Sequence, residues 1–120
     1  MPRAAPSIDS YGAGGFRLSG AWRDGSILIV GDEPRAWAVR APADLTPESL
    51  APVFEAGRAE VEFLLLGMGP ANALPPRDVR DSIRAAGMGL EFMDTPSAAR
   101  LYNVLTSEGR RLAAGLIAFG

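Results

Sequence analysis

The residues best suited to bind a small molecule follow an apolar run at residues 63–70, FLLLGMGP. Gly67 and Gly69 come directly after a strand-like stretch, and Asp94 ends the next such stretch along the chain. In dinucleotide-binding units, glycines at this turn admit a phosphate, and an acid at the end of the next strand binds a ribose hydroxyl. This spacing therefore raises the hypothesis of a bound phosphate.

Two features of the loop weaken that hypothesis. The motif lacks its third glycine, because Pro70, Ala71 and Asn72 follow Gly69. The prolines at 75–76 delay the next helix, so its N-terminal dipole cannot lie at the loop. We therefore favour the simpler interpretation, in which the glycines let the backbone turn tightly off a buried strand.

A crevice shared by two strands is the better candidate site. If strands 61–66 and 89–93 are parallel neighbours, the 67–69 loop and the start of a helix over 95–108 border one crevice at their carboxyl ends, where open α/β sheets usually bind ligands. Backbone amides and a fixed positive charge there would suit a small anion, a nucleotide or an acidic side chain. The candidate crevice residues are Gly67, Gly69, Asp94, Thr95, Arg100 and Asn103.

The same side chains also have structural interpretations. Thr95 is typical of a helix cap, and Asp94 could accept hydrogen bonds from the same amides. Arg100 could be a solvated surface residue. Asn103 is poorly suited to the middle of a helix, so we expect it to bond a nearby loop, for which the 70–76 segment is the obvious choice.

Glu108 and Arg110 flank Gly109 and form a predicted structural pair. An ion pair between them would hold the end of the third helix to the following segment. Exposed pairs of this kind contribute only ~0–1 kcal/mol.

The composition excludes several kinds of chemistry. The 120 residues include no cysteine and no histidine, so there is no thiol catalysis and no thiolate or imidazole metal ligand. The charge is −2 and the arginines are scattered, which argues against nucleic-acid binding. We find no metal site and expect no cofactor.

No stretch is long and apolar enough for a membrane helix, so no membrane insertion is expected. The N-terminal MPRAAPSIDSYG has no apolar signal region and is too short for a presequence. We expect a flexible tail over 1–7, one domain over 8–120, and a cytoplasmic protein.

The first half of the chain is predicted to be mainly β. Residues 16–22 and 26–30 resemble the two strands of a hairpin, with Asp24-Gly25 as its tight turn. Residues 36–41 predict a third short strand. Phe16 and Trp22 are aromatics that could contact a partner, although core positions are the commoner role for each.

The second half alternates between helices and strands. A short helix is expected over 46–57, with Thr46 as cap, Pro47 at its first position and Gly57 as its end. An amphipathic helix follows over 77–86, and Gly87 ends it.

The final segment, 110–119, is predicted to be a strand, and an edge strand near the C-terminus could pair with a second copy. The parallel strands and their crossover helices give a small three-layer α/β fold, with a mixed sheet, packed helices and an N-terminal antiparallel hairpin layer.

Several stretches in this order are similar to the family of domain of unknown function 498: SYGAGGFRLSG, then LLLGMG, then DTPSAARLYNVLTSEGRRLAAGLI. The resemblance extends from about Ile8 to Phe119. It implies an α/β fold with a mixed sheet. The family includes a mitochondrial assembly factor of NADH:ubiquinone oxidoreductase, respiratory complex I, and it has no established enzymatic activity.

Three functional hypotheses follow. The resemblance implies a non-catalytic interaction module whose partners would be respiratory-complex subunits or assembly factors, here in a bacterial cytoplasmic relative. The alternative is a small-anion or nucleotide binder at the crevice. An enzyme is the third, and it would need Asp94, Arg100 or Tyr102 in catalytic roles.

Overall fold

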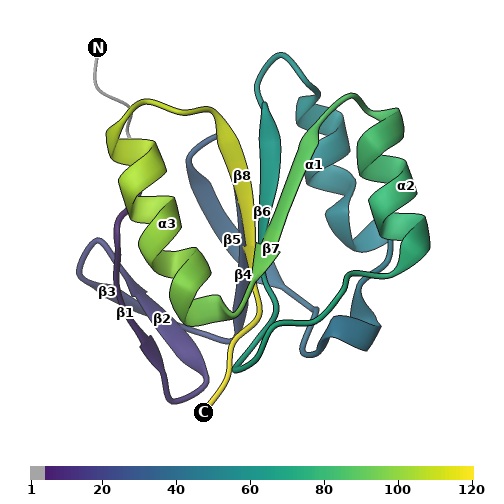
Figure 1. Cartoon of the computed structure of the whole chain (residues 1–120). Coiled ribbons are helices and arrows are strands. Elements are labelled where there is room, and N and C mark those ends of the chain that lie inside the picture. The colour runs from purple at the N-terminus through teal and green to yellow at the C-terminus, as the bar shows by residue number, and fades with distance from the viewer. Residues whose placement is uncertain (1–4) are drawn as a thin grey trace.

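The computed structural model describes residues 5–120, whose strands form two sheets (Figure 1). The smaller sheet is antiparallel, in the order β1-β2-β3. Its strands are β1 (Ile8–Gly12), β2 (Gly15–Leu18) and β3 (Ala21–Asp24). The larger sheet is mixed and has the order β5-β4-β8-β6-β7. Its strands are β4 (Ser26–Val30), β5 (Glu33–Trp37), β6 (Phe63–Gly67), β7 (Gly89–Met93) and β8 (Leu112–Leu116).

Helices cover both faces of the five-stranded sheet. The helical elements are two 3-10 turns, η1 (Pro42–Asp44) and η2 (Glu48–Leu50), and the helices α1 (Ala51–Ala56), α2 (Arg77–Ala85) and α3 (Thr95–Ser107). The first two helices lie on one face, whereas α3 and the three-stranded sheet lie on the other (Figure 1). The predicted three-layer α/β fold is confirmed.

The core explains why the central strands read as continuous apolar runs. Successive side chains of a strand point to opposite faces of the sheet. In β4, Leu28 packs toward α1 and α2, whereas Ile27 and Ile29 pack toward α3 and the small sheet. In β6, Leu64 and Leu65 divide in the same way. A strand with helices or strands on both faces needs apolar residues at every position.

The predicted N-terminal hairpin was wrong in its pairing. Strand β2 pairs with β3 through a turn at Ser19 and Gly20, and both turn residues have positive φ, at 46° and 86°. Residues 26–30 belong to the other sheet, and Gly25 is the corner between the two sheets. The burial pattern separates these strands, because β3 is exposed at every position and β4 is buried at every position.

The predicted third strand overlaps the observed one only in part. Strand β5 spans Glu33–Trp37 rather than residues 36–41 and pairs with β4. Asp32, with φ 64°, lies in the turn that joins these two strands. Pro34 within β5 is tolerated because this strand lies at the sheet edge.

The C-terminal strand is confirmed, but its predicted place at an edge was wrong. Strand β8 lies between β4 and β6, antiparallel to the first and parallel to the second. In the described chain the edges of the larger sheet are β5 and β7. A dimer built on the C-terminal strand would therefore have no free edge to use.

The predicted helix over 46–57 is shorter than expected, because Glu48–Leu50 form the 3-10 turn η2 after Pro47, and α1 begins only at Ala51. The Thr46 side chain accepts a hydrogen bond from Ser49 N at 3.1 Å, and Pro52 lies in the first turn of the short α1. Gly57 and Gly87 follow α1 and α2 with φ values of 77° and 75°.

The predicted tail over 1–7 lies partly outside the described residues. Of its last three residues, Ser7 is bonded to the turn between β2 and β3, because its carbonyl accepts from Ser19 N at 2.9 Å.

Candidate functional site

Thr95 joins three segments at the carboxyl ends of the central strands. Its Oγ1 accepts a hydrogen bond from Gly69 N at 2.9 Å and donates one to the Ile117 carbonyl at 2.8 Å. Its own N–H donates to the Gly69 carbonyl at 2.8 Å. The Thr95 side chain is fully buried. We call Gly67, Gly69, Thr95 and Ile117 the junction.

The two glycines of the junction have different roles. A Cβ on Gly67 would lie 2.9 Å from Thr95 Oγ1 and from Leu116 Cδ2, so only glycine lets α3 begin this close to β6. Gly69 has a φ of 103°, a conformation that other residues rarely adopt. The glycines thus admit a side chain of the protein itself and turn the chain off the strand.

Asp94 caps α3, whereas the sequence pattern predicted Thr95 in this role. Its carboxylate accepts a hydrogen bond from Ser97 N at 2.8 Å. The Ser97 backbone and side chain hold the pKa of Asp94 below its ordinary value of 3.8, and the Arg100 charge acts in the same direction. The Ser97 amide, which could have met an external anion, therefore already donates to a carboxylate of the chain.

Arg100 and Asn103 face the three-stranded sheet rather than the crevice. Arg100 donates to the Tyr11 hydroxyl at 3.1 Å. The Asn103 amide accepts from Ile8 N and donates to the Ile8 carbonyl, both at 2.8 Å. The expected bond from Asn103 to the 70–76 segment was therefore wrong, and both residues hold α3 to β1.

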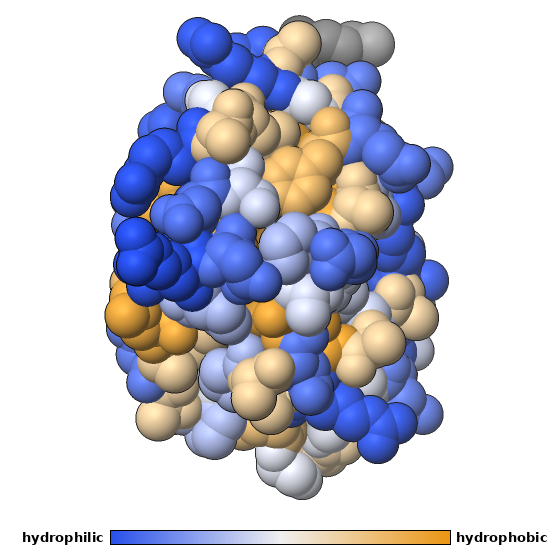
Figure 2. Space-filling model, turned by 90° about the vertical axis from the view of Figure 1, so that its right-hand side faces the viewer, coloured by the Kyte–Doolittle hydropathy of each residue, from blue (hydrophilic) through white to orange (hydrophobic). Residues whose placement is uncertain are grey.

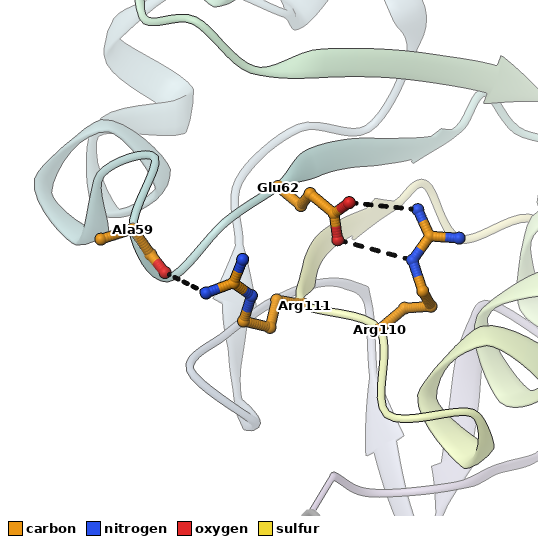
Figure 3. A network of polar contacts seen from close by, with 4 residues as sticks. All are labelled: Ala59, Glu62, Arg110 and Arg111. Atoms are coloured by element: carbon orange, nitrogen blue, oxygen red, sulfur yellow. Dashed lines mark hydrogen bonds and ion pairs between the residues drawn. The ribbon is translucent and has the colours of Figure 1, made fainter.

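Arg110 forms an ion pair with Glu62, and the pair with Glu108 stays a prediction. The two side chains approach to 3.4 Å, and the guanidinium lies 5.3 Å from the centre of the Phe63 ring. The neighbouring Arg111 donates to the Ala59 carbonyl at 2.9 Å (Figure 3). These contacts hold the start of β8 against the start of β6.

The candidate residues therefore divide into two groups. Gly67, Gly69, Asp94 and Thr95 meet at one end of the sheet, as the parallel pairing predicted. Arg100 and Asn103 meet β1 farther along α3. A ligand at the first group would have to replace the bonds that Thr95 and Asp94 already make.

Tyr102 offers little to catalysis by a bound substrate. It is 1% exposed and belongs to the core between α3 and the two sheets. A hydroxyl at this depth is not accessible to a substrate from solvent.

One of the two aromatic residues proposed as partner contacts is exposed, and it lies on β3. Trp22 is 40% exposed, whereas Phe16, named with it, is fully buried. The Trp22 indole donates to the Asp24 carboxylate at 2.8 Å. A Cβ on Gly15 would lie 2.7 Å from Trp22 Cζ2, so the ring rests directly against that glycine. Strand alternation places Gly15, Trp22 and Asp24 on the outer face of the small sheet, opposite the buried Phe16. We call these three residues the Trp22 platform.

The face of the molecule formed by α1 and α2 is mixed in hydropathy. On the side of α1 and α2, hydrophobic residues form separate groups between hydrophilic ones (Figure 2). Arg77 and Asp81 on the exposed side of α2 approach to 3.7 Å. Among residues 5–120, no helix has the length and hydropathy needed to cross a membrane.

Comparison with known proteins identifies relatives along most of the chain. The model of a family described as protein of unknown function DUF498/DUF598 matches residues 8–117. An uncharacterized protein of Rhodobacter capsulatus is 40% identical over 110 residues, which cover 92% of this chain and 82% of that protein.

A more distant relative carries a functional name. NADH dehydrogenase (ubiquinone) 1 alpha subcomplex assembly factor 3 of Danio rerio is 32% identical over 114 residues, covering 95% of this chain. The match covers 65% of that protein, so the chain spans less than two thirds of its length.

Solved structures share the fold. A Bartonella henselae structure described as an outer membrane protein has a TM-score of 0.91 at 31% identity, with 100% of this chain and 99% of that chain covered. A Bordetella pertussis structure described as an Mth938-like domain has a TM-score of 0.80 at 27% identity, with 98% and 88% covered.

Proposed function

The chain belongs to the family of unknown function DUF498/DUF598, and on that premise we propose that it is a non-catalytic protein-interaction module that acts in assembly of a respiratory complex. The named relative, an assembly factor of NADH dehydrogenase, supports this choice. The partners in this proposal are subunits or other assembly factors of that complex.

The Trp22 platform is the observation that carries the proposal. Tryptophan is enriched among residues that dominate binding energy, because it offers a large rigid surface at low entropic cost. Here the ring is fixed by Gly15 beneath it and by Asp24 at its nitrogen, so little further ordering is needed on binding. All four residues of β3 are exposed, which leaves space for a partner over the platform.

The polar residues of the family-like C-terminal stretch support a structural role for that stretch. Thr95 bonds the junction, Asn103 bonds β1 and Arg110 bonds Glu62. Each of these residues uses hydrogen bonds to hold α3 or the start of β8 against another element. We therefore assign recognition to surface side chains and not to this stretch.

The test is capture of partners after mild crosslinking in the native host, followed by mass spectrometry. We expect tagged protein to recover respiratory subunits or assembly proteins, and Trp22→Ala to lose them. Leu74→Ala is the matched control, because Leu74 is a 62% exposed apolar residue outside the platform. Equal recovery by the Trp22 and Leu74 variants would contradict the proposal.

The proposal places the protein in the cytoplasm, and cell fractionation tests that placement. Two similar proteins carry membrane names, the Bartonella structure and a 13 kDa major membrane protein of Francisella tularensis. We expect the free protein in the cytoplasmic fraction and the crosslinked complex with the membranes. Free protein found only with membranes would require a different compartment.

A further inference from the structure

Strand β7 leaves backbone hydrogen-bonding groups open at the edge of the larger sheet. Gly89 N donates to Glu62 O at 3.1 Å and Met93 O accepts from Met68 N at 2.7 Å, so these two residues face β6. Alternate residues of a strand direct both backbone groups to the same side. Leu90 and Phe92 therefore direct their N–H and C=O groups away from the sheet.

A groove runs beside this edge, between β7 and α3. Its volume is about 550 Å³, and it is open to solvent. Phe63, Leu101 and Leu105 supply its apolar lining, and Glu62, Glu91 and Arg110 supply its charged lining. An extended chain added to β7 would direct alternate side chains into this groove.

Gly89 creates a notch in the groove. The register pairs Gly89 with Phe63, and a Cβ on Gly89 would lie 3.0 Å from Phe63 Cβ. Strand β7 thus has no side chain of its own at this point. A large apolar side chain on a neighbouring strand would cover the glycine beside Phe63, whose ring already has the Arg110 guanidinium 5.3 Å from its centre.

The negative charge of Glu91 favours a positively charged residue on a strand added beside β7. Its side chain is exposed on the α3 side of β7, two residues from the notch. The neighbouring Arg110 pairs with Glu62 at 3.4 Å. Opposite charges directly across a strand pair stabilise it, so a basic residue fits opposite Glu91.

The same carboxylate disfavours a second copy of this chain. Antiparallel pairing of two β7 strands over their full length would place Glu91 opposite Glu91 of the other copy. Like charges directly opposite destabilise such a pair. A different protein is therefore the better occupant.

From these observations we propose that β7 accepts an extended segment of a partner protein as a sixth strand. The segment carries a basic residue opposite Glu91 and a large apolar residue, two positions away, over Gly89. Main-chain bonds to Leu90 and Phe92 give affinity, and the groove gives selectivity. This inference rests on the proposed interaction role but uses a surface other than the Trp22 platform.

Synthetic peptides test the proposal directly. One ten-residue probe has a central Arg-Val-Trp within polar β-forming residues, and its match has Glu-Val-Trp. We expect the wild-type protein to bind the arginine probe about tenfold more tightly, and Glu91→Arg to reverse that preference. Glu60→Arg is the control, because Glu60 is an exposed acid that does not line the groove.

Hydrogen exchange separates strand addition from other binding. With the arginine probe in excess, the Leu90 and Phe92 amides should gain protection. Binding without that protection, equal affinity for both probes, or no binding at millimolar concentration would each overturn the proposal. A free protein that is already dimeric with these amides protected would also overturn it, in favour of a second copy.

The two proposals can fail separately. Partners that are captured through Trp22 while both probes fail would leave the interaction module standing and remove only the strand-addition site. Probes that bind as expected while capture recovers nothing would remove the respiratory partners and retain the edge of β7 as a peptide site.

Discussion

In two regions of the molecule a glycine makes room for a larger side chain, and the outcomes are opposite. At the junction, Gly67 admits Thr95, which is fully buried and bonded to both neighbouring segments. On the small sheet, Gly15 supports Trp22, which stays 40% exposed. A glycine therefore accommodates a buried, hydrogen-bonded side chain where helices cover the sheet, and a partly exposed aromatic ring on the small sheet.

The comparison predicts that changes at the junction affect stability and that changes at the platform affect binding. Trp22→Ala should change the free energy of unfolding by less than about 1 kcal/mol, because the ring is only partly buried. The variants below test the other half of the comparison, from the largest expected effect to the smallest.

Thr95→Val should destabilise the protein most. Valine keeps the shape but leaves the Gly69 N–H and the Ile117 C=O buried without this partner, which costs about 3 kcal/mol in the free energy of unfolding. Urea denaturation measures the loss. Thr95→Ser keeps the hydroxyl and should retain most of the stability. A Thr95→Val variant as stable as the wild type would contradict the role of the bonds, and equal losses for the two variants would show that the buried methyl group matters as much as they do.

Gly67→Ala should cost about 2 kcal/mol, because the added methyl group meets Thr95 and Leu116 at 2.9 Å. The same denaturation experiment measures this loss. Ala71→Val also adds apolar atoms, but at an exposed position of the following loop, and it should have almost no effect on stability. A stable Gly67→Ala variant would mean that α3 can shift away from β6, against the geometry described.

Asn103→Ala should cost about 1–2 kcal/mol and act locally. It removes both bonds to Ile8, which is 5% exposed, so the start of the first strand is held less firmly to α3. Hydrogen exchange should quicken at Ile8 more than in β6. Arg100→Ala removes only an exposed bond to Tyr11 and serves as the matched control.

Acid should weaken the cap of α3. The pKa of Asp94 in the folded protein lies below its ordinary value of 3.8, so its contribution is present above that pH and is lost as the pH falls through the lowered value. Asp94→Asn keeps a capping side chain without titrating. Melting temperatures from about pH 5 to about pH 2 should therefore fall less steeply in this variant than in the wild type. Identical slopes would contradict the assignment.

Inorganic phosphate should have the smallest effect, which is none on the melting temperature. The Asp94 carboxylate already occupies the Ser97 amide, and Thr95 fills the space beside Gly67. A rise in melting temperature that Arg100→Ala abolishes would restore the anion-binding hypothesis for the crevice.

Much of the fold follows from local sequence signals, whereas strand pairing does not. The glycines at 57 and 87 predicted where α1 and α2 end, because such residues act on adjacent backbone groups, whereas Thr46 and Pro47 predicted the start of α1 too early. The hairpin was assigned to the wrong strands because both Ser19-Gly20 and Asp24-Gly25 are turn sequences. Only the contrast between the exposed β3 and the wholly buried β4 separates the two sheets.

The sequence predicted which residues meet at the candidate site, but it did not predict the hydrogen-bond partners of their side chains. Parallel pairing correctly brought Gly67, Gly69, Asp94 and Thr95 together. The partner of each polar group depends on distances across the fold, such as that from Asn103 to Ile8, and spacing along the chain cannot supply these. The exposure of Trp22 likewise depends on which face of a small sheet is covered.

The place of β8 has a consequence for synthesis of the chain. This strand is made after all the other described strands, yet it joins the β4–β5 pair to the β6–β7 pair. During folding, the β4–β5 hairpin and the β6–β7 unit therefore cannot join into one sheet until β8 inserts between them. Until then their open edges are exposed to other chains, so a holding chaperone is expected to help at this stage and to be released once β8 inserts.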